Sequence, residues 1–150
     1  DGKDTVSYIN AINNVDNKKE NSGKTTSTPN EIQLLINQIL AEKKISFERK
    51  SSTITADSNP TLVRIAKVLE DNKNIKVEIA GHTDSRGDKN LNKQISQDRA
   101  NSVKIALIDL GVDENRLIAV GYGEEFPIAK DDENGLSEIN RRVEFKVIGK

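Results

Sequence analysis

The segment from Ala80 to Asn90, AGHTDSRGDKN, holds the side chains of this chain that could most readily do chemistry. An apolar run ends here, and Gly81, His82, Thr83 and Asp84 follow it. The change is typical either of an ordinary turn after a strand or of a strand end that presents a site. His82 is the only histidine, and we expect it, with Gly81, to support the loop through hydrogen bonds rather than to act as a base or metal ligand.

The composition excludes several kinds of chemistry. The chain has no cysteine, which removes disulfides, thiolate catalysis and thiolate metal sites, and zinc would need Asp and Glu alone. Its 23 basic and 24 acidic residues nearly balance, which argues against a general affinity for nucleic acid or anionic membranes. No apolar run approaches the roughly 20 residues that span a bilayer. We expect no cofactor and no metal.

The first 30 residues differ from the rest. Residues 16–30 are rich in Lys, Asn, Ser and Thr and contain no apolar side chain, which indicates a flexible linker. Residues 1–15 are either an unstructured end or the last strand of a preceding domain. The chain does not begin with Met, so we expect a processed or shortened chain whose anchoring segment has been removed. Residues 31–150 are predicted to form the single binding domain.

The apolar spacing of residues 29–149 predicts alternating helices and strands. Thr28, Pro29 and Glu31 form a capping box that starts a helix over 29–43. A long helix is expected from Leu91 to Leu110, with Gly111 as its stop. Its apolar stripe is Leu91, Ile95, Val103, Ala106, Leu107 and Leu110. Further elements are a strand, turn and short strand over 45–54, a helix over 59–72, and strands over 74–81, 116–123 and 141–149. The order predicts an α+β fold, a mixed β-sheet covered on one face by helices.

Many spaced residues carry a family likeness. They are Gly81-His82-Thr83-Asp84, Gly87, Asn92, Ile95-Ser96, Arg99-Ala100, Val103, Gly111-Val112, Arg116, Gly121-Tyr122-Gly123-Glu124, Pro127-Ile128 and Asn140-Arg141-Arg142-Val143-Glu144. On these residues the chain resembles, over about 31–148, the OmpA C-terminal-like family. Outer-membrane OmpA proteins, peptidoglycan-associated lipoproteins and flagellar motor stator proteins share this domain. The resemblance implies a βαβαβ-type fold and no enzymatic activity.

The resemblance also implies a ligand. Members of the family bind peptidoglycan non-covalently through the diaminopimelate residue of the stem peptide, and the residues that hold it correspond to Asp84 and Arg99. The chain is then expected to anchor an envelope protein to the cell wall. We expect it on the periplasmic face of the envelope, associated with the outer membrane in the full-length protein.

The ligand's chemistry fits these residue types. The side chain of diaminopimelate ends in a carbon that carries both an ammonium and a carboxylate. Asp84 can accept from the ammonium, and Arg99 can hold the carboxylate as a bidentate fork. Both are expected at the carboxyl end of one strand, where ligands of α/β sheets usually bind. Thr83 and Asn92 would add neutral hydrogen bonds.

Four points stay open. Arg99 falls on the apolar stripe of its helix, so a salt bridge between Asp84 and Arg99 that only closes the fold is an alternative to a ligand site. Asn140 is expected to line the groove, but Arg141 and Arg142 alternate across a strand, and only one of them can face the site. Relatives have an arginine where this chain has Leu136, and its role is in doubt here. The rival function is a stator- or secretion-type structural component that dimerises, with wall binding secondary.

Overall fold

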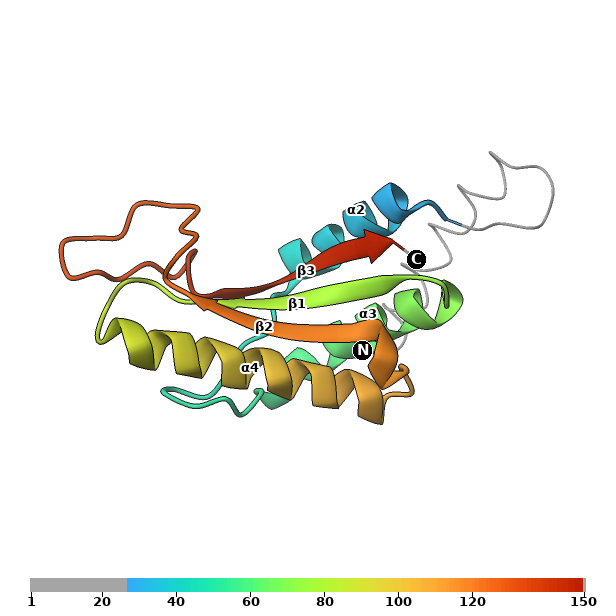
Figure 1. Ribbon diagram of the computed structural model, residues 1–150, viewed down its shortest axis with the longest axis horizontal. Coiled ribbons are helices and arrows are strands. Elements are labelled where there is room, and N and C mark those ends of the chain that lie inside the picture. The colour runs from blue at the N-terminus through green and yellow to red at the C-terminus, as the bar shows by residue number, and fades with distance from the viewer. Residues whose placement is uncertain (1–26, 150) are drawn as a thin grey trace.

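The computed structural model describes residues 27–149, so the predictions for the first 26 residues lie outside it. The elements are α2 (Pro29–Glu42), the short 3-10 turn η1 (Ala56–Ser58), α3 (Asn59–Asp71), β1 (Lys76–His82), α4 (Lys89–Asp109), the 3-10 turn η2 (Glu114–Arg116), β2 (Leu117–Gly123) and β3 (Arg142–Gly149). The sheet has the order β2-β1-β3 (Figure 1). β1 runs parallel to β2 and antiparallel to β3, which confirms the mixed sheet.

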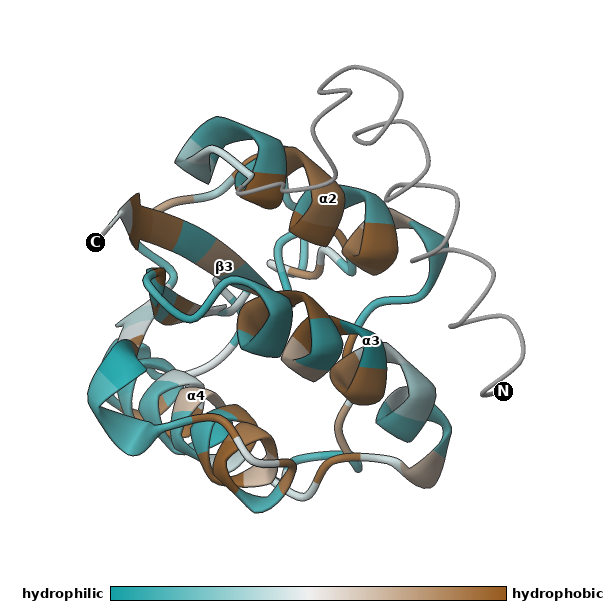
Figure 2. Ribbon diagram, turned by 90° about the vertical axis from the view of Figure 1, so that its right-hand side faces the viewer, coloured by the Kyte–Doolittle hydropathy of each residue, from teal (hydrophilic) through white to brown (hydrophobic). Residues whose placement is uncertain are grey.

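Helices cover one face of this sheet. α4 lies along β1 and β2, α2 lies beside β3, and α3 packs between these two helices (Figure 2). Strand side chains alternate between this covered face and the other, which we call the open face. The open face carries Glu78, Ala80, His82, Tyr122, Arg142, Glu144 and Lys146. The covered face supplies the apolar core with Val77, Ile79, Val143 and Phe145. The prediction of helices on one face is confirmed.

Local signals set the helix ends. Thr28 accepts from the Glu31 amide while the Glu31 carboxylate accepts from the Thr28 amide, so the predicted capping box at the start of α2 is present. Asp88 caps α4 by accepting from the amides of Asn90 and Leu91. Gly111, at φ +106°, follows the last residues of α4 as expected.

The predicted apolar stripe of α4 is partly wrong. Leu91 is 68% exposed and Leu110 43%, and the buried residues of the helix are Ser96, Ala100, Val103 and Leu107. Leu91 lies five residues before Ser96, which places it about 140° away around the helix. Ser96 and Ala100 are the small residues of the buried side, Val103 and Leu107 extend it, and Leu91 and Leu110 lie outside it.

The close contact between α4 and the sheet depends on two glycines. Gly81 of β1 and Gly121 of β2 are register partners. A Cβ atom on Gly81 would lie 2.3 Å from the carbonyl oxygen of Ser96, and one on Gly121 would lie 2.3 Å from the backbone nitrogen of Gln97. These glycines therefore fix the distance of α4 from the strands, and with it the position of every side chain on this helix.

The segment over 45–54 does not form the two strands that we predicted. It forms an isolated antiparallel bridge between Phe47 and Ile54, outside the sheet. Glutamine side chains pair with the two outer strands. Gln33 of α2 donates to the carbonyl of Phe145 and accepts from the amide of Val147, at 2.7 Å each. Gln97 of α4 pairs in the same way with Ala119 and Gly121 of β2.

Candidate functional site

Asp84 lies two residues beyond the end of β1 and is only 6% exposed. Its Oδ2 accepts from Arg141 Nη1 at 2.5 Å and from the Ser137 amide at 3.1 Å. Its Oδ1 accepts from the Arg86 amide at 3.2 Å. A buried carboxylate with three donors is held rigidly, and Oδ1 still has capacity for a further donor.

Arg141, just before β3, and Arg142, the first residue of β3, point in different directions. Arg141 pairs with Asp84 and is 40% exposed at its side chain. Arg142 lies on the open face, where its Nε donates to Glu144 at 2.5 Å and its Nη groups donate to the carbonyls of Asn140 and Phe126. The sequence left this choice open, and the structure places Arg141 at Asp84.

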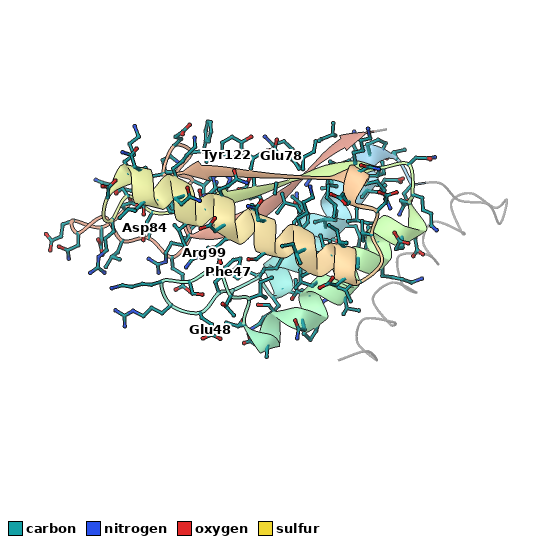
Figure 3. All side chains as sticks on the ribbon, turned by 60° about the horizontal axis from the view of Figure 1, so that its bottom comes forward. Phe47, Glu48, Glu78, Asp84, Arg99 and Tyr122 are labelled. Atoms are coloured by element: carbon teal, nitrogen blue, oxygen red, sulfur yellow. The ribbon has the colours of Figure 1, made fainter. Side chains whose placement is uncertain are left out.

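Arg99 approaches the same region from α4. Its Nε donates to the carbonyl of Ser51 at 2.8 Å, and its guanidinium lies 5.0 Å from the ring centroid of Phe47. Figure 3 shows Asp84, Arg99 and Phe47 on the same side of the sheet, with Tyr122 and Glu78 on the other. Burial, and then the positive charge of Arg141, lower the pKa of Arg99 from its ordinary value.

Arg99 does not pair with Asp84. Within residues 27–149 it forms no ion pair, and its two terminal nitrogens have no hydrogen-bond partner. The alternative of a closing salt bridge between Asp84 and Arg99 is therefore wrong for the free chain, because Arg141 takes that place. Arg141 alone is paired with the Asp84 carboxylate, and its positive charge acts on the neighbouring Arg99.

The neutral residues brace the loop. The Thr83 amide donates to the carbonyl of Gly123, and its hydroxyl donates to the carbonyl of Asp84 at 2.8 Å. The Asn92 side-chain amide donates to the carbonyl of Arg86 and to Glu124, at 3.0 Å each. Both therefore hold Asp84 in place through the backbone around it.

Asn140 does not line the groove, and that expectation is wrong. It is fully buried. Its side-chain oxygen accepts from the amides of Ile128 and Ala129, and its nitrogen donates to the carbonyl of Ala129 and to Asp131. It organises the long loop before β3 from the inside. This use exhausts its capacity for hydrogen bonds to a ligand.

His82 supports the end of β1, but not by the hydrogen bonds that we expected. Its ring stacks on Tyr122, with centroids 5.5 Å apart and planes 14° from parallel. Both ring nitrogens are buried and have no hydrogen-bond partner among the described residues. Burial, followed by the charge of Arg142, lowers the pKa of His82 below its ordinary value of 6.5.

Sequence reasoning missed three parts of the site. Phe47 and Ser51 hold Arg99, and the backbone amide of Ser137 holds Asp84. Leu136, where the resemblance implied an arginine, contributes its backbone to a turn with Asp132. The carbonyl of Ser51 and the amide of Ser137 are backbone groups, which the residue type does not reveal. Only the Phe47 side chain could have been identified from the sequence.

Other kinds of site find no support in residues 27–149. No cluster of three or more His, Cys, Asp or Glu side chains could hold a metal ion there. In the same range no helix has the length and apolar character needed to cross a membrane. The charged groups of the candidate site are therefore the rigid carboxylate of Asp84 and the guanidinium groups of Arg141 and Arg99.

Comparisons with known proteins agree with this fold. A model of the OmpA family matches residues 46–141. The chain is 35% identical over 100 residues to the peptidoglycan-associated lipoprotein of Mesorhizobium japonicum, which covers 67% of this chain. It spans 60% of that lipoprotein and less than half of several longer curated relatives.

Solved structures agree as well. The peptidoglycan-associated lipoprotein of Burkholderia pseudomallei superposes with a TM-score of 0.64 and 31% identity, covering 73% of this chain and 92% of the lipoprotein. The cell wall anchor of the type VI secretion system of Pseudomonas aeruginosa superposes with a TM-score of 0.62 and 26% identity, covering 77% of this chain and 97% of the anchor.

Proposed function

Because the chain belongs to the OmpA family, we propose that it binds peptidoglycan non-covalently through the diaminopimelate residue of the stem peptide, and so anchors an envelope protein to the cell wall. The relatives of the OmpA, peptidoglycan-associated lipoprotein and MotB types are anchoring or structural envelope proteins, not enzymes. By analogy with them, the chain acts on the periplasmic side of the envelope, associated with the outer membrane in the full-length protein.

One observation carries the proposal. The terminal nitrogens of Arg99 lack a partner among the described residues, while Arg141, whose charge acts on Arg99, is paired with Asp84. Two cations and one anion leave an excess positive charge in a partly buried place. A half-buried guanidinium whose terminal nitrogens have no acceptor among the described residues is available to an anion from solution.

The ligand's two charges match this arrangement. Its carboxylate can take both terminal nitrogens of Arg99 in a bidentate contact. Its ammonium can donate to Asp84 Oδ1, which accepts only the Arg86 amide. Ser51 and Phe47 hold Arg99 in advance, so binding costs little side-chain entropy.

The same contacts predict selectivity. A lysine-type stem peptide ends in an ammonium without a carboxylate, so it can reach Asp84 but leaves Arg99 without an anion. We expect it to bind about tenfold or more weakly, the loss of a charge-assisted contact. Equal affinity for the two stems would contradict the role of Arg99.

The test is a calorimetric titration of the chain with a diaminopimelate-containing stem tripeptide. Asp84→Ala and Arg99→Ala should abolish binding while circular dichroism shows that both variants stay folded. Lys104→Ala is the matched control, because it removes a cation from the same helix five residues further on. If the tripeptide does not bind the wild type, or if Lys104→Ala matters as much as Arg99→Ala, the proposal fails.

A second candidate is a role in a stator or a secretion system, the latter being the assembly to which one structural neighbour belongs. In it the domain is a structural, dimerising component and wall binding is secondary. Light scattering on the free chain separates the two, because a dimer that persists in Asp84→Ala would support this role. A monomer that binds the stem tripeptide would support the first.

A further inference from the structure

A cavity lies on the open face of the sheet, and neither Asp84 nor Arg99 lines it. Its volume is about 530 Å³, within the range of roughly 300–1,000 Å³ common for small-ligand sites. Its walls include Ala80, His82, Tyr122, Phe126, Arg142 and Glu144. The cation–anion clamp of the proposed function uses none of these residues.

The aromatic side chains form a fixed corner. Phe126 meets Tyr122 edge to face, with centroids 5.3 Å apart and planes 81° from parallel. Tyr122 donates to Glu78 at 2.7 Å, which holds its ring, and Arg142 donates to the backbone carbonyl of Phe126 at 3.0 Å, which holds the loop that carries the second ring. Phe126 is nevertheless 54% exposed. An exposed, immobilised ring is a surface on which the apolar face of a ring-shaped ligand can stack.

The charges around the cavity cancel. Glu125 and Glu144 are acidic, and Arg142 and Lys146 are basic. Arg142 and Glu144 are already paired with each other. A cavity without a net charge, but with charged groups that donate and accept, suits a neutral ligand rich in hydroxyl groups better than an ion.

His82 is the independent sign of a ligand. It is 7% exposed, lines the cavity, and has two buried nitrogens without partners among the described residues. Its lowered pKa keeps the ring neutral at pH 7, so one nitrogen donates and the other accepts. A hydroxyl has the same dual character. Glu144 Oε1 lies 3.8 Å from the buried His82 Nε2, so a hydroxyl that enters where the half-exposed Glu144 side chain turns aside can accept from the imidazole and donate to the carboxylate.

We propose that this open-face cavity, built on Tyr122, Phe126, His82, Arg142 and Glu144, binds a neutral saccharide. The inference deepens the proposed function, because peptidoglycan consists of sugar chains to which the stem peptides are attached. One ligand then meets two subsites. The stem peptide takes the clamp at Asp84 and Arg99, and the sugar chain takes the open face at the same end of the sheet.

The test is a ¹⁵N NMR titration of the chain with chitotetraose, a neutral β-1,4-linked sugar without a stem peptide. We expect shifts at β1, β2 and β3 residues lining the cavity, and roughly tenfold weaker binding for Phe126→Ala, which loses a stacking partner. Leu91→Ala is the control, because Leu91 is exposed and lies outside the cavity. It should bind as the wild type does.

The two proposals fail separately. Asp84→Asn should lose the stem tripeptide and keep chitotetraose, and Phe126→Ala should do the reverse. No shift at the cavity up to about 10 mM sugar, or equal loss in Phe126→Ala and Leu91→Ala, would overturn the saccharide site while leaving the stem-peptide result intact. If chitotetraose binds and the tripeptide does not, the clamp is wrong and the saccharide site stands.

Discussion

Gly121→Ala should destabilise this domain strongly, although it adds a single methyl group. The new Cβ would lie 2.3 Å from the backbone nitrogen of Gln97 and 2.7 Å from Ser96 Oγ, against an ordinary contact distance of 3.4 Å or more. Relief requires α4 to move away from β2 by about 1 Å. The contact is with helix backbone, which cannot rotate away as a long side chain can.

The cost follows from what such a shift disturbs. Overpacking of a tightly packed interface costs about 1–3 kcal/mol. The pairing of Gln97 with Ala119 and Gly121, at 3.0 and 2.9 Å, would also stretch, and each hydrogen bond contributes about 1 kcal/mol. Alanine offsets less than about 1 kcal/mol of this loss, because it restricts the unfolded chain more than glycine does. We expect a net loss of about 3 kcal/mol in the free energy of unfolding.

Urea denaturation followed by circular dichroism measures this loss, with an unchanged m-value as the sign of the same unfolding transition. The matched control is Gly111→Ala, whose Cβ would meet nothing within 4 Å. That variant should lose only about 1 kcal/mol, because its φ of +106° disfavours alanine. If Gly121→Ala costs no more than Gly111→Ala, the argument that two glycines set the helix distance is refuted. A shift of α4 should also weaken stem-peptide binding, because Arg99 lies two residues after Gln97.

Three further predictions concern single side chains. Arg99→Lys should keep the fold and weaken diaminopimelate binding about tenfold, since lysine cannot make the bidentate contact; unchanged affinity by calorimetry would contradict this. Arg116→Ala should cost about 2–4 kcal/mol by urea denaturation, because the guanidinium donates to three backbone carbonyls and to Glu70. A melting temperature within a degree of wild type would mean that solvent replaces those bonds. His82 should make stability fall as the pH drops below about 7, because its folded pKa is lowered and the unfolded chain takes up the proton first. Thermal melts from pH 7.5 to 5.5 should show a smaller fall in His82→Phe; parallel curves would exclude His82 as the source.

The sequence was sufficient for the layout of the domain because its signals are local. The capping box at Thr28, the stop at Gly111 and the alternation of Val143 and Phe145 each act within a few residues. The apolar periodicity predicted α4 less well. Leu91 fits the apolar spacing of the sequence but is exposed in the structure. In the N-terminal part of α4 the buried side consists of Ser96 and Ala100, small residues that carry little hydrophobic signal, whereas Val103 and Leu107 were predicted.

The candidate site was only partly predictable, for a physical reason. The family resemblance named Asp84 and Arg99, but not that Arg141 would occupy Asp84 in the free chain. Which of two adjacent arginines faces a site depends on the phase of the strand that follows. The amide of Ser137 and the carbonyl of Ser51 belong to the backbone, and every residue has these groups. The open-face cavity arises from contacts between β1, β2, β3 and the loop after β2, which no single segment encodes.

The glutamines at the two edges of the sheet affect how the domain behaves at high local protein concentration. A three-stranded sheet ordinarily exposes two rows of unsatisfied backbone groups, each a template on which another chain can add a strand and start a fibre. Gln33 occupies part of one row and Gln97 part of the other. Many copies of the domain can therefore be crowded against a surface without joining sheet to sheet, and any specific self-association must use a different face.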